Sequence, residues 1–206
     1  SEKLFIVKKL LLILILTFSF QTLSKADDIR DFEIEGMSIG DSLLDYFSKD
    51  EIEDYLMLDY YTNLPKDYSE IYRIVEFKRL PSFKTYTNVT MDFFKKDNEF
   101  IIQTISGVLF VNNTKECHDK QNQIDDELSK VFKNTLRETN QNNHSFDNSG
   151  NSKTKAINYW FDNDDLVTLI CTDWSNEITN SYGWDDNLSV EIKSKEYNNF
   201  LIEAYK

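Results

Sequence analysis

The sequence predicts an α+β fold, with helices packed on one face of a meandering antiparallel sheet. Six runs alternate apolar and polar residues with the period of a strand, and other runs repeat apolar residues with the period of a helix. The links between successive strands are too short for parallel crossovers, which favours antiparallel pairing. The order is helices, three strands, helix, three strands, helix, so helices and strands are segregated as in α+β domains.

Residues 1–26 have the three parts of a secretory signal peptide. A start with three lysines precedes an apolar run over residues 10–20, and small residues lie three positions and one position before a cleavage point after Ala26. The alternative is a membrane anchor, but a spanning helix needs about 20 apolar residues, and polar residues interrupt this run. We therefore expect a periplasmic protein in which residues 27–206 form a single domain without a membrane span.

The strongly negative net charge of the chain disfavours some classes of binding partner. Residues 27–206 keep 19 of the 23 basic and 35 of the 36 acidic residues, a net charge of −16. Such a charge repels nucleic-acid phosphates and anionic lipid headgroups, while it also suits a well-solvated surface. We expect no nucleic-acid partner, and an envelope protein or a small ligand instead.

The two cysteines, Cys117 and Cys171, are predicted to form a disulfide. Cys117 begins an apolar helical stripe that continues through Leu128 and Phe132, and Cys171 shares one side of a strand with Leu169. Both sulfur atoms should therefore point into the same core, in a compartment that permits disulfides. The alternative is a pair of buried free thiols.

The first predicted helix covers residues 38–47, where Ser38 and Asp41 make an N-terminal capping pattern. A second short helix is expected within residues 50–58, and two more over 117–136 and 195–204, while the polar residues 138–155 are expected to form a loop. The predicted strands are 71–78, 85–94, 99–111, 155–162, 165–174 and 187–194. Because residues 27–114 and 115–206 repeat one order of elements, two tandem helix-plus-three-strand halves are an alternative to a single undivided domain.

The string Gly40-Asp41-Ser42-Leu43 resembles the signature of a family of serine esterases, which would make Ser42 a nucleophile. In that family an Asp-x-x-His near the C-terminus supplies the base. Neither His118 nor His144 has an aspartate three residues before it, and a serine needs a positioned base to react. We therefore predict a non-enzymatic protein without catalytic residues. The alternative is an exported hydrolase whose acidic residues the sequence does not locate.

A second resemblance involves "GMSIGDSLLDYF", residues 36–47. It is similar to the entry of the first helix in the small lipoprotein of the outer-membrane barrel assembly machinery and in β-lactamase-inhibitor-like domains. That resemblance implies helices packed on an antiparallel sheet. The chain departs from the lipoprotein because it lacks the lipidated cysteine and the Gly-x-Pro turn. Residues 27–206 also resemble a family of exported proteins of AT-rich marine alphaproteobacteria, which implies a location and little about chemistry.

A candidate binding surface follows from the hairpin of the strands 155–162 and 165–174. Burying Ile157 and Tyr159 beside Val167 and Leu169 requires a turn with an odd number of residues. The opposite face then receives four apolar side chains among polar neighbours, of which we predict three to bind a ligand or partner: Trp160, Ile170 and Trp174, with Leu166 beside them. The alternative is that a loop or the N-terminal helix covers this face as a second core.

Metal and cofactor sites are not expected. Two cysteines and two separated histidines do not match the ligand spacing of a zinc site. The acidic turns at 162–165 and 184–186 offer oxygen ligands of the kind that calcium prefers. Asp and Asn are also ordinary turn residues, however, so we predict no metal and no cofactor.

Overall fold

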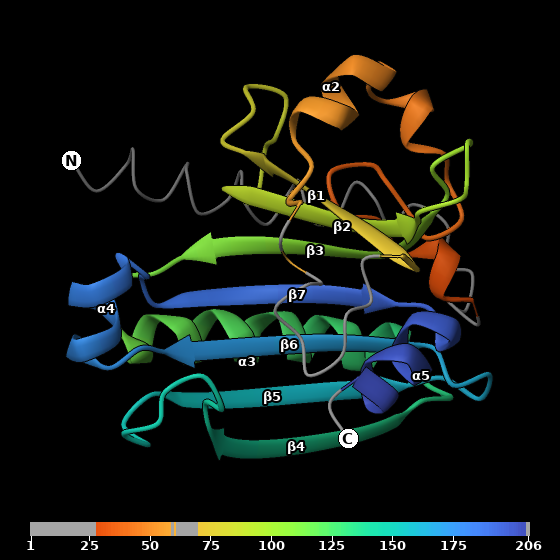
Figure 1. Cartoon of the computed structure of the whole chain (residues 1–206). Helices are drawn as coiled ribbons and strands as arrows, with labels where there is room; N and C mark the ends of the chain where they lie inside the picture. Colours follow the sequence, from red (N-terminus) through yellow and green to blue (C-terminus); the bar gives the residue numbers. More distant parts are fainter. Residues whose placement is uncertain (1–27, 59, 61–69, 205–206) are drawn as a thin grey trace, which may run out of the picture.

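A computed structural model describes residues 28–58, 60 and 70–204, so the predicted signal peptide lies outside the described residues. Seven strands form one antiparallel sheet in the order β1-β2-β3-β7-β6-β5-β4 (Figure 1). The predicted α+β class and the antiparallel meander are confirmed. The first meander is β1 (Tyr72–Lys78), β2 (Asn88–Phe94) and β3 (Ile102–Phe110), and the second is β4 (Leu136–Asn143), β5 (Lys153–Trp160), β6 (Leu166–Asp173) and β7 (Asn187–Lys193).

The helical elements are short apart from one. The described residues contain the 3-10 turns η1 (Ile29–Asp31) and η2 (Leu43–Asp45), and the helices α2 (Lys49–Asp54), α3 (Thr114–Val131), α4 (Asn176–Tyr182) and α5 (Lys195–Ala204). None of the helices in the described ranges combines the length and the hydropathy needed to cross a membrane.

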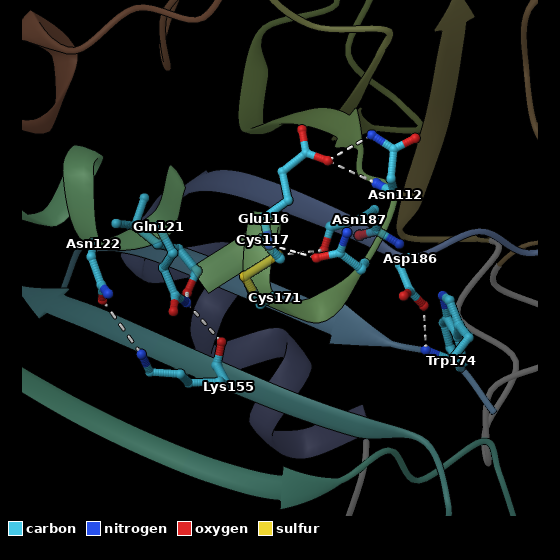
Figure 2. Close-up of a disulfide and its surroundings, with 12 residues drawn as sticks. Asn112, Glu116, Cys117, Gln121, Asn122, Lys155, Cys171, Trp174, Asp186 and Asn187 are labelled. Atoms are coloured by element: carbon cyan, nitrogen blue, oxygen red, sulfur yellow. Dashed lines mark hydrogen bonds between the residues drawn. A yellow bond between two sulfur atoms is a disulfide. The ribbon is translucent and has the colours of Figure 1, made fainter. Parts of the chain in front are cut away.

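One face of the sheet carries the main core. Its inward side chains pack against the N-terminal segment over the first meander and against α3 over the second. Gln121 of α3 is fully buried, and its amide nitrogen donates to the carbonyl oxygens of Lys155 and Leu169 at 2.8 and 3.0 Å (Figure 2). The predicted Cys117–Cys171 disulfide is present and buried, so it fixes the first turn of α3 to β6.

The C-terminal helix packs on the other face. Tyr197 of α5 lies against Tyr72 and Ile74 of β1, and the ring centroids of Tyr72 and Tyr197 are 5.2 Å apart. The expectation that helices pack on one face thus describes α3, whereas α5 covers the second face. The cause is that β1 is apolar on both sides, so the apolar stripe of α5 can bury against it.

The second meander has one strand more than predicted. Residues 136–143 lie within the expected helix end and loop, yet they form β4, an edge strand whose eight residues are all exposed. With both faces in water, this strand has no apolar alternation that sequence could reveal. Four strands therefore follow α3, against three before it, and strands of both predicted halves join in one sheet through seven residue pairs between β3 and β7.

The predicted helix over residues 38–47 is wrong. Gly40 has a φ of +91°, outside the helical region, and its N–H donates to the carbonyl oxygen of Ile102. The N–H of Ile102 donates back to the carbonyl of Asp41, so this segment pairs with the start of β3 and only η2 remains helical. The second predicted helix is confirmed as α2, which ends at Asp54.

The hairpin register of β5 and β6 is as predicted. Tyr159 lies opposite Val167 and Ile157 opposite Leu169, which places these four side chains in the core. The turn between Phe161 and Asp165 has three residues, an odd number, because the N–H of Phe161 donates to the carbonyl oxygen of Asp165.

We expect the disulfide to stabilise the fold by about 4 kcal/mol, because the bridged residues are 54 positions apart and the bridge restricts the unfolded chain. Urea unfolding of Cys117→Ala/Cys171→Ala should show a loss of that size. A loss below about 1 kcal/mol would contradict this expectation.

Ser38→Ala should lower the free energy of unfolding by about 1–2 kcal/mol. The reason is not a helix cap: the buried Ser38 hydroxyl lies within hydrogen-bond distance of the carbonyl oxygens of Arg30 and Phe32, at 2.8 and 2.9 Å. Urea unfolding can compare it with Ser82→Ala at an exposed position. Equal stabilities of the two variants would show that this hydroxyl contributes nothing.

Candidate functional site

Five aromatic side chains gather at one end of the sheet. We call them the aromatic cluster: His144, Phe146, Trp174, Tyr182 and Trp184. They come from the β4–β5 connection, the end of β6, α4 and the segment before β7. The β4–β5 connection and α4 lie at the same end of the sheet (left in Figure 1), because β4 to β7 are neighbours in the sheet.

The rings contact one another in a continuous series. Centroid distances are 4.3 Å for His144–Trp174, 4.8 Å for Trp174–Trp184 and 4.6 Å for Trp184–Phe146, and Tyr182 packs beside the last two. Phe146, Tyr182 and Trp184 remain 45%, 57% and 37% exposed. Aromatic groups that contact one another and still face water are typical of binding surfaces.

Asp147 shapes the loop that carries His144 and Phe146. One carboxylate oxygen accepts from the N–H and hydroxyl of Ser149, and the other accepts from the N–H and hydroxyl of Ser152. These hydrogen bonds hold the pKa of Asp147 well below its usual range, so the carboxylate stays ionised. The Ser152 hydroxyl also accepts from the N–H of Ser175, the N-cap of α4, which ties this loop to the helix.

The two tryptophans are fixed through their backbones. The N–H of Trp174 donates to a carboxylate oxygen of Asp186 at 2.8 Å, close to the disulfide (Figure 2). The Thr179 hydroxyl donates to the carbonyl oxygen of Trp184. Gly183, with a φ of +69°, ends α4 in the left-handed conformation and turns the chain between Tyr182 and Trp184.

The surroundings of His144 favour its neutral form. Burial lowers its pKa, although the charge of Asp147 acts in the opposite direction. Its Nδ1 accepts a hydrogen bond from the N–H of Phe146 at 3.2 Å, which requires an unprotonated Nδ1. Protonation of that nitrogen would break this bond and place a charge beside Trp174.

The three sequence-predicted binding residues lie on the second face but do not form one patch. Trp160 lies opposite Leu136 and Leu166, with its indole N–H donating to Glu138, and Ile170 is half-buried in mid-strand. Trp160 and Trp174 are at opposite ends of the sheet, about 27 Å apart along the strands. Trp174 alone of the three belongs to the aromatic cluster.

Other sequence candidates have structural roles. Ser42 caps η2, and its hydroxyl donates to the carbonyl oxygen of Glu99. In the acidic turn 162–165, Asp164 pairs with Lys195 and Asp165 accepts from the Lys195 N–H. Within the described residues, no group of three or more His, Cys, Asp or Glu side chains is arranged to hold a metal ion.

Sequence reasoning missed four members of the cluster. His144 and Phe146 interrupt a polar Asn- and Ser-rich run, and Tyr182 and Trp184 flank Gly183 after a polar helix. Aromatic residues in segments that are otherwise polar are a usable signal, because such loops seldom bury them.

Comparisons with models of protein families, with curated proteins and with solved structures found no match. The function of this chain is therefore inferred from its geometry.

The stability of the protein should fall as the pH decreases from 7.5 to 6, in a way that depends on His144. The unfolded chain binds a proton with the usual histidine pKa, whereas the folded state resists it, so acidification favours unfolding. His144→Gln should flatten this dependence in urea titrations. An unchanged profile in His144→Gln would exclude this histidine as the cause.

Proposed function

We propose that this protein is an exported, periplasmic, non-enzymatic binding protein and that the aromatic cluster is its contact surface. The single observation that carries the proposal is the combination of order and exposure at the cluster. Each segment is held in place by its own hydrogen bonds, while three of the five rings remain open to solvent. Rigid, exposed aromatic side chains contribute strongly to protein interfaces.

The export part of the proposal rests on two features. The first is the signal-like pattern of residues 1–26, and the second is the buried disulfide, which is typical of oxidising compartments.

The shape of the cluster favours a macromolecular partner over a small ligand. Small-molecule sites are concave and enclose most of their ligand. The described residues line two concave regions: one of about 60 Å³ lies beside the disulfide and borders the cluster at Lys153 and Asp173, and one of about 440 Å³ lies between Ile39 and Lys195. No ring of the cluster lines either region. An outward-facing group of rings fits the surface of another protein.

Site-specific photo-crosslinking in cells tests this proposal. A photoreactive phenylalanine at position 182 should give a discrete adduct that fractionates with the periplasmic extract. The same group at position 202, an exposed site on α5, should not. Phe146→Ala should reduce the adduct from position 182, because it removes a ring against which Tyr182 packs.

The proposal fails if position 182 gives no adduct, or if positions 182 and 202 give the same adducts. Turnover of a substrate by the purified protein would instead support the alternative of an exported hydrolase.

A further inference from the structure

The charges around the aromatic cluster are strongly unbalanced. The segments 143–153 and 173–187, which carry its five rings, contain one basic residue, Lys153, and five acidic residues: Asp147, Asp173, Glu177, Asp185 and Asp186. Lys153 lies opposite Asp173 in the β5–β6 register, and its ammonium group bonds to Asn143 and the Gly150 carbonyl. The two segments together therefore carry a net charge of 1 − 5 = −4.

This imbalance differs from the acidity of the rest of the chain. On α3, Glu116 and Asp119 form salt bridges with lysines one turn away. Within the described part of the chain, none of the five carboxylates near the cluster is in a salt bridge. The two segments thus carry negative charge that is not paired in salt bridges within the described residues.

The carboxylates also act on one another. Burial raises the pKa of Asp186, and the negative charges of Asp173 and Asp185 raise it further. The N–H of Trp174, the residue after Asp173, donates to Asp186, the residue after Asp185, so the backbones that carry these three carboxylates are neighbours. A cation placed beside them would reduce the repulsion among their negative charges.

The rings supply the second half of the recognition chemistry. A cation above the face of a tryptophan or tyrosine is attracted by the ring quadrupole, and tryptophan is the strongest partner. Trp184 and Tyr182 are the exposed rings of this type, and the exposed carboxylate of Asp185 directly follows Trp184. The Nδ1 of His144 accepts a hydrogen bond from the Phe146 N–H, which requires that nitrogen to be unprotonated, so a competing positive charge at the cluster is disfavoured.

From this combination we infer that the partner contacts the cluster with a basic segment, an arginine or lysine side chain lying over the Trp184 and Tyr182 rings with its charge toward Asp185. This inference rests on the proposed function, because it names the chemistry of the partner at the same surface.

Two short peptides separate charge from shape. One is a Gly-Ser-Arg-Ser-Gly peptide, and the other has citrulline, a neutral group of nearly the same shape, in place of arginine. Titration is followed through the indole N–H signals of the three tryptophans, with Trp160 at the far end of the sheet as an internal control. The arginine peptide should shift the Trp174 and Trp184 signals, leave Trp160 unchanged, and bind about fivefold more tightly than the citrulline peptide.

Two matched variants test whether the carboxylate of Asp185 contributes to binding of the arginine peptide. Asp185→Asn should weaken the arginine peptide about twofold and leave the citrulline peptide unaffected. Asp126→Asn removes an exposed charge further along α3, away from the first turn that the disulfide joins to β6, and should change neither. Equal affinities of the two peptides, no shift at millimolar concentrations, or equal effects of the two variants would overturn the inference.

The two proposals can fail separately. A crosslink at position 182 together with equal binding of both peptides would retain the contact surface and reject a basic partner. Selective arginine binding without any crosslink at position 182 would retain the cation preference and reject the proposed protein contact.

Discussion

The sheet depends on the pairing of β3 with β7. In the observed strand order this ladder joins the two meanders, and it links residues that are about 80 positions apart. Both strands are buried on the core face, where Ile105 lies opposite Ile192 and Gly107 lies opposite Val190. The Thr104 hydroxyl adds a bond to the Ile192 carbonyl. Without this register, the N-terminal segment and α3 would cover two separate small sheets, neither large enough for a core of this size.

Close packing on the core face makes that register specific. A Cβ built on Gly107 would lie 2.5 Å from the Tyr86 ring, so the glycine lets the ring lie directly on β3. The loop that carries Tyr86 is held in turn by Glu35, whose carboxylate accepts from the N–H groups of Lys84, Thr85 and Tyr86. The N-terminal segment, this loop and β3 therefore form one packed unit.

Much of the fold could be predicted because burial leaves a periodic pattern. The core side chains of β5 and β6 lie at every second position, Ile157 and Tyr159 opposite Leu169 and Val167, so this spacing predicted the register. The same spacing placed Cys117 and Cys171 on faces that meet. β4 could not be predicted, because a strand with two wet faces has no such pattern. The prediction of a helix over residues 38–47 was wrong although a pattern is present. The apolar residues there have helical spacing, but hydrogen bonds of Gly40 and Asp41 with Ile102 determine the backbone conformation.

The candidate site could be predicted only in part. The alternation of side chains between the two faces of the sheet placed Trp174 on the second face, but it also placed Trp160 there. Alternation carries no information about distance along a strand, so the two residues were grouped although they lie far apart. His144, Phe146, Tyr182 and Trp184 meet through the lateral order of β4 to β7. The order of strands in a sheet follows from tertiary contacts, so the cluster could be recognised only in the structure.

The edge position of β4 bears on how long the cluster persists. This strand pairs with β5 alone among the described strands, buries no side chain, and is tied to α3 by the Arg137–Asp125 salt bridge. Strands of this kind open at the lowest free energy in a fold, well below global unfolding. Opening of β4 would release the backbone just before His144 and Phe146, whereas Trp174 and Trp184 lie in the connection between the interior strands β6 and β7. Local opening at this edge would therefore separate His144 and Phe146 from the other rings without global unfolding.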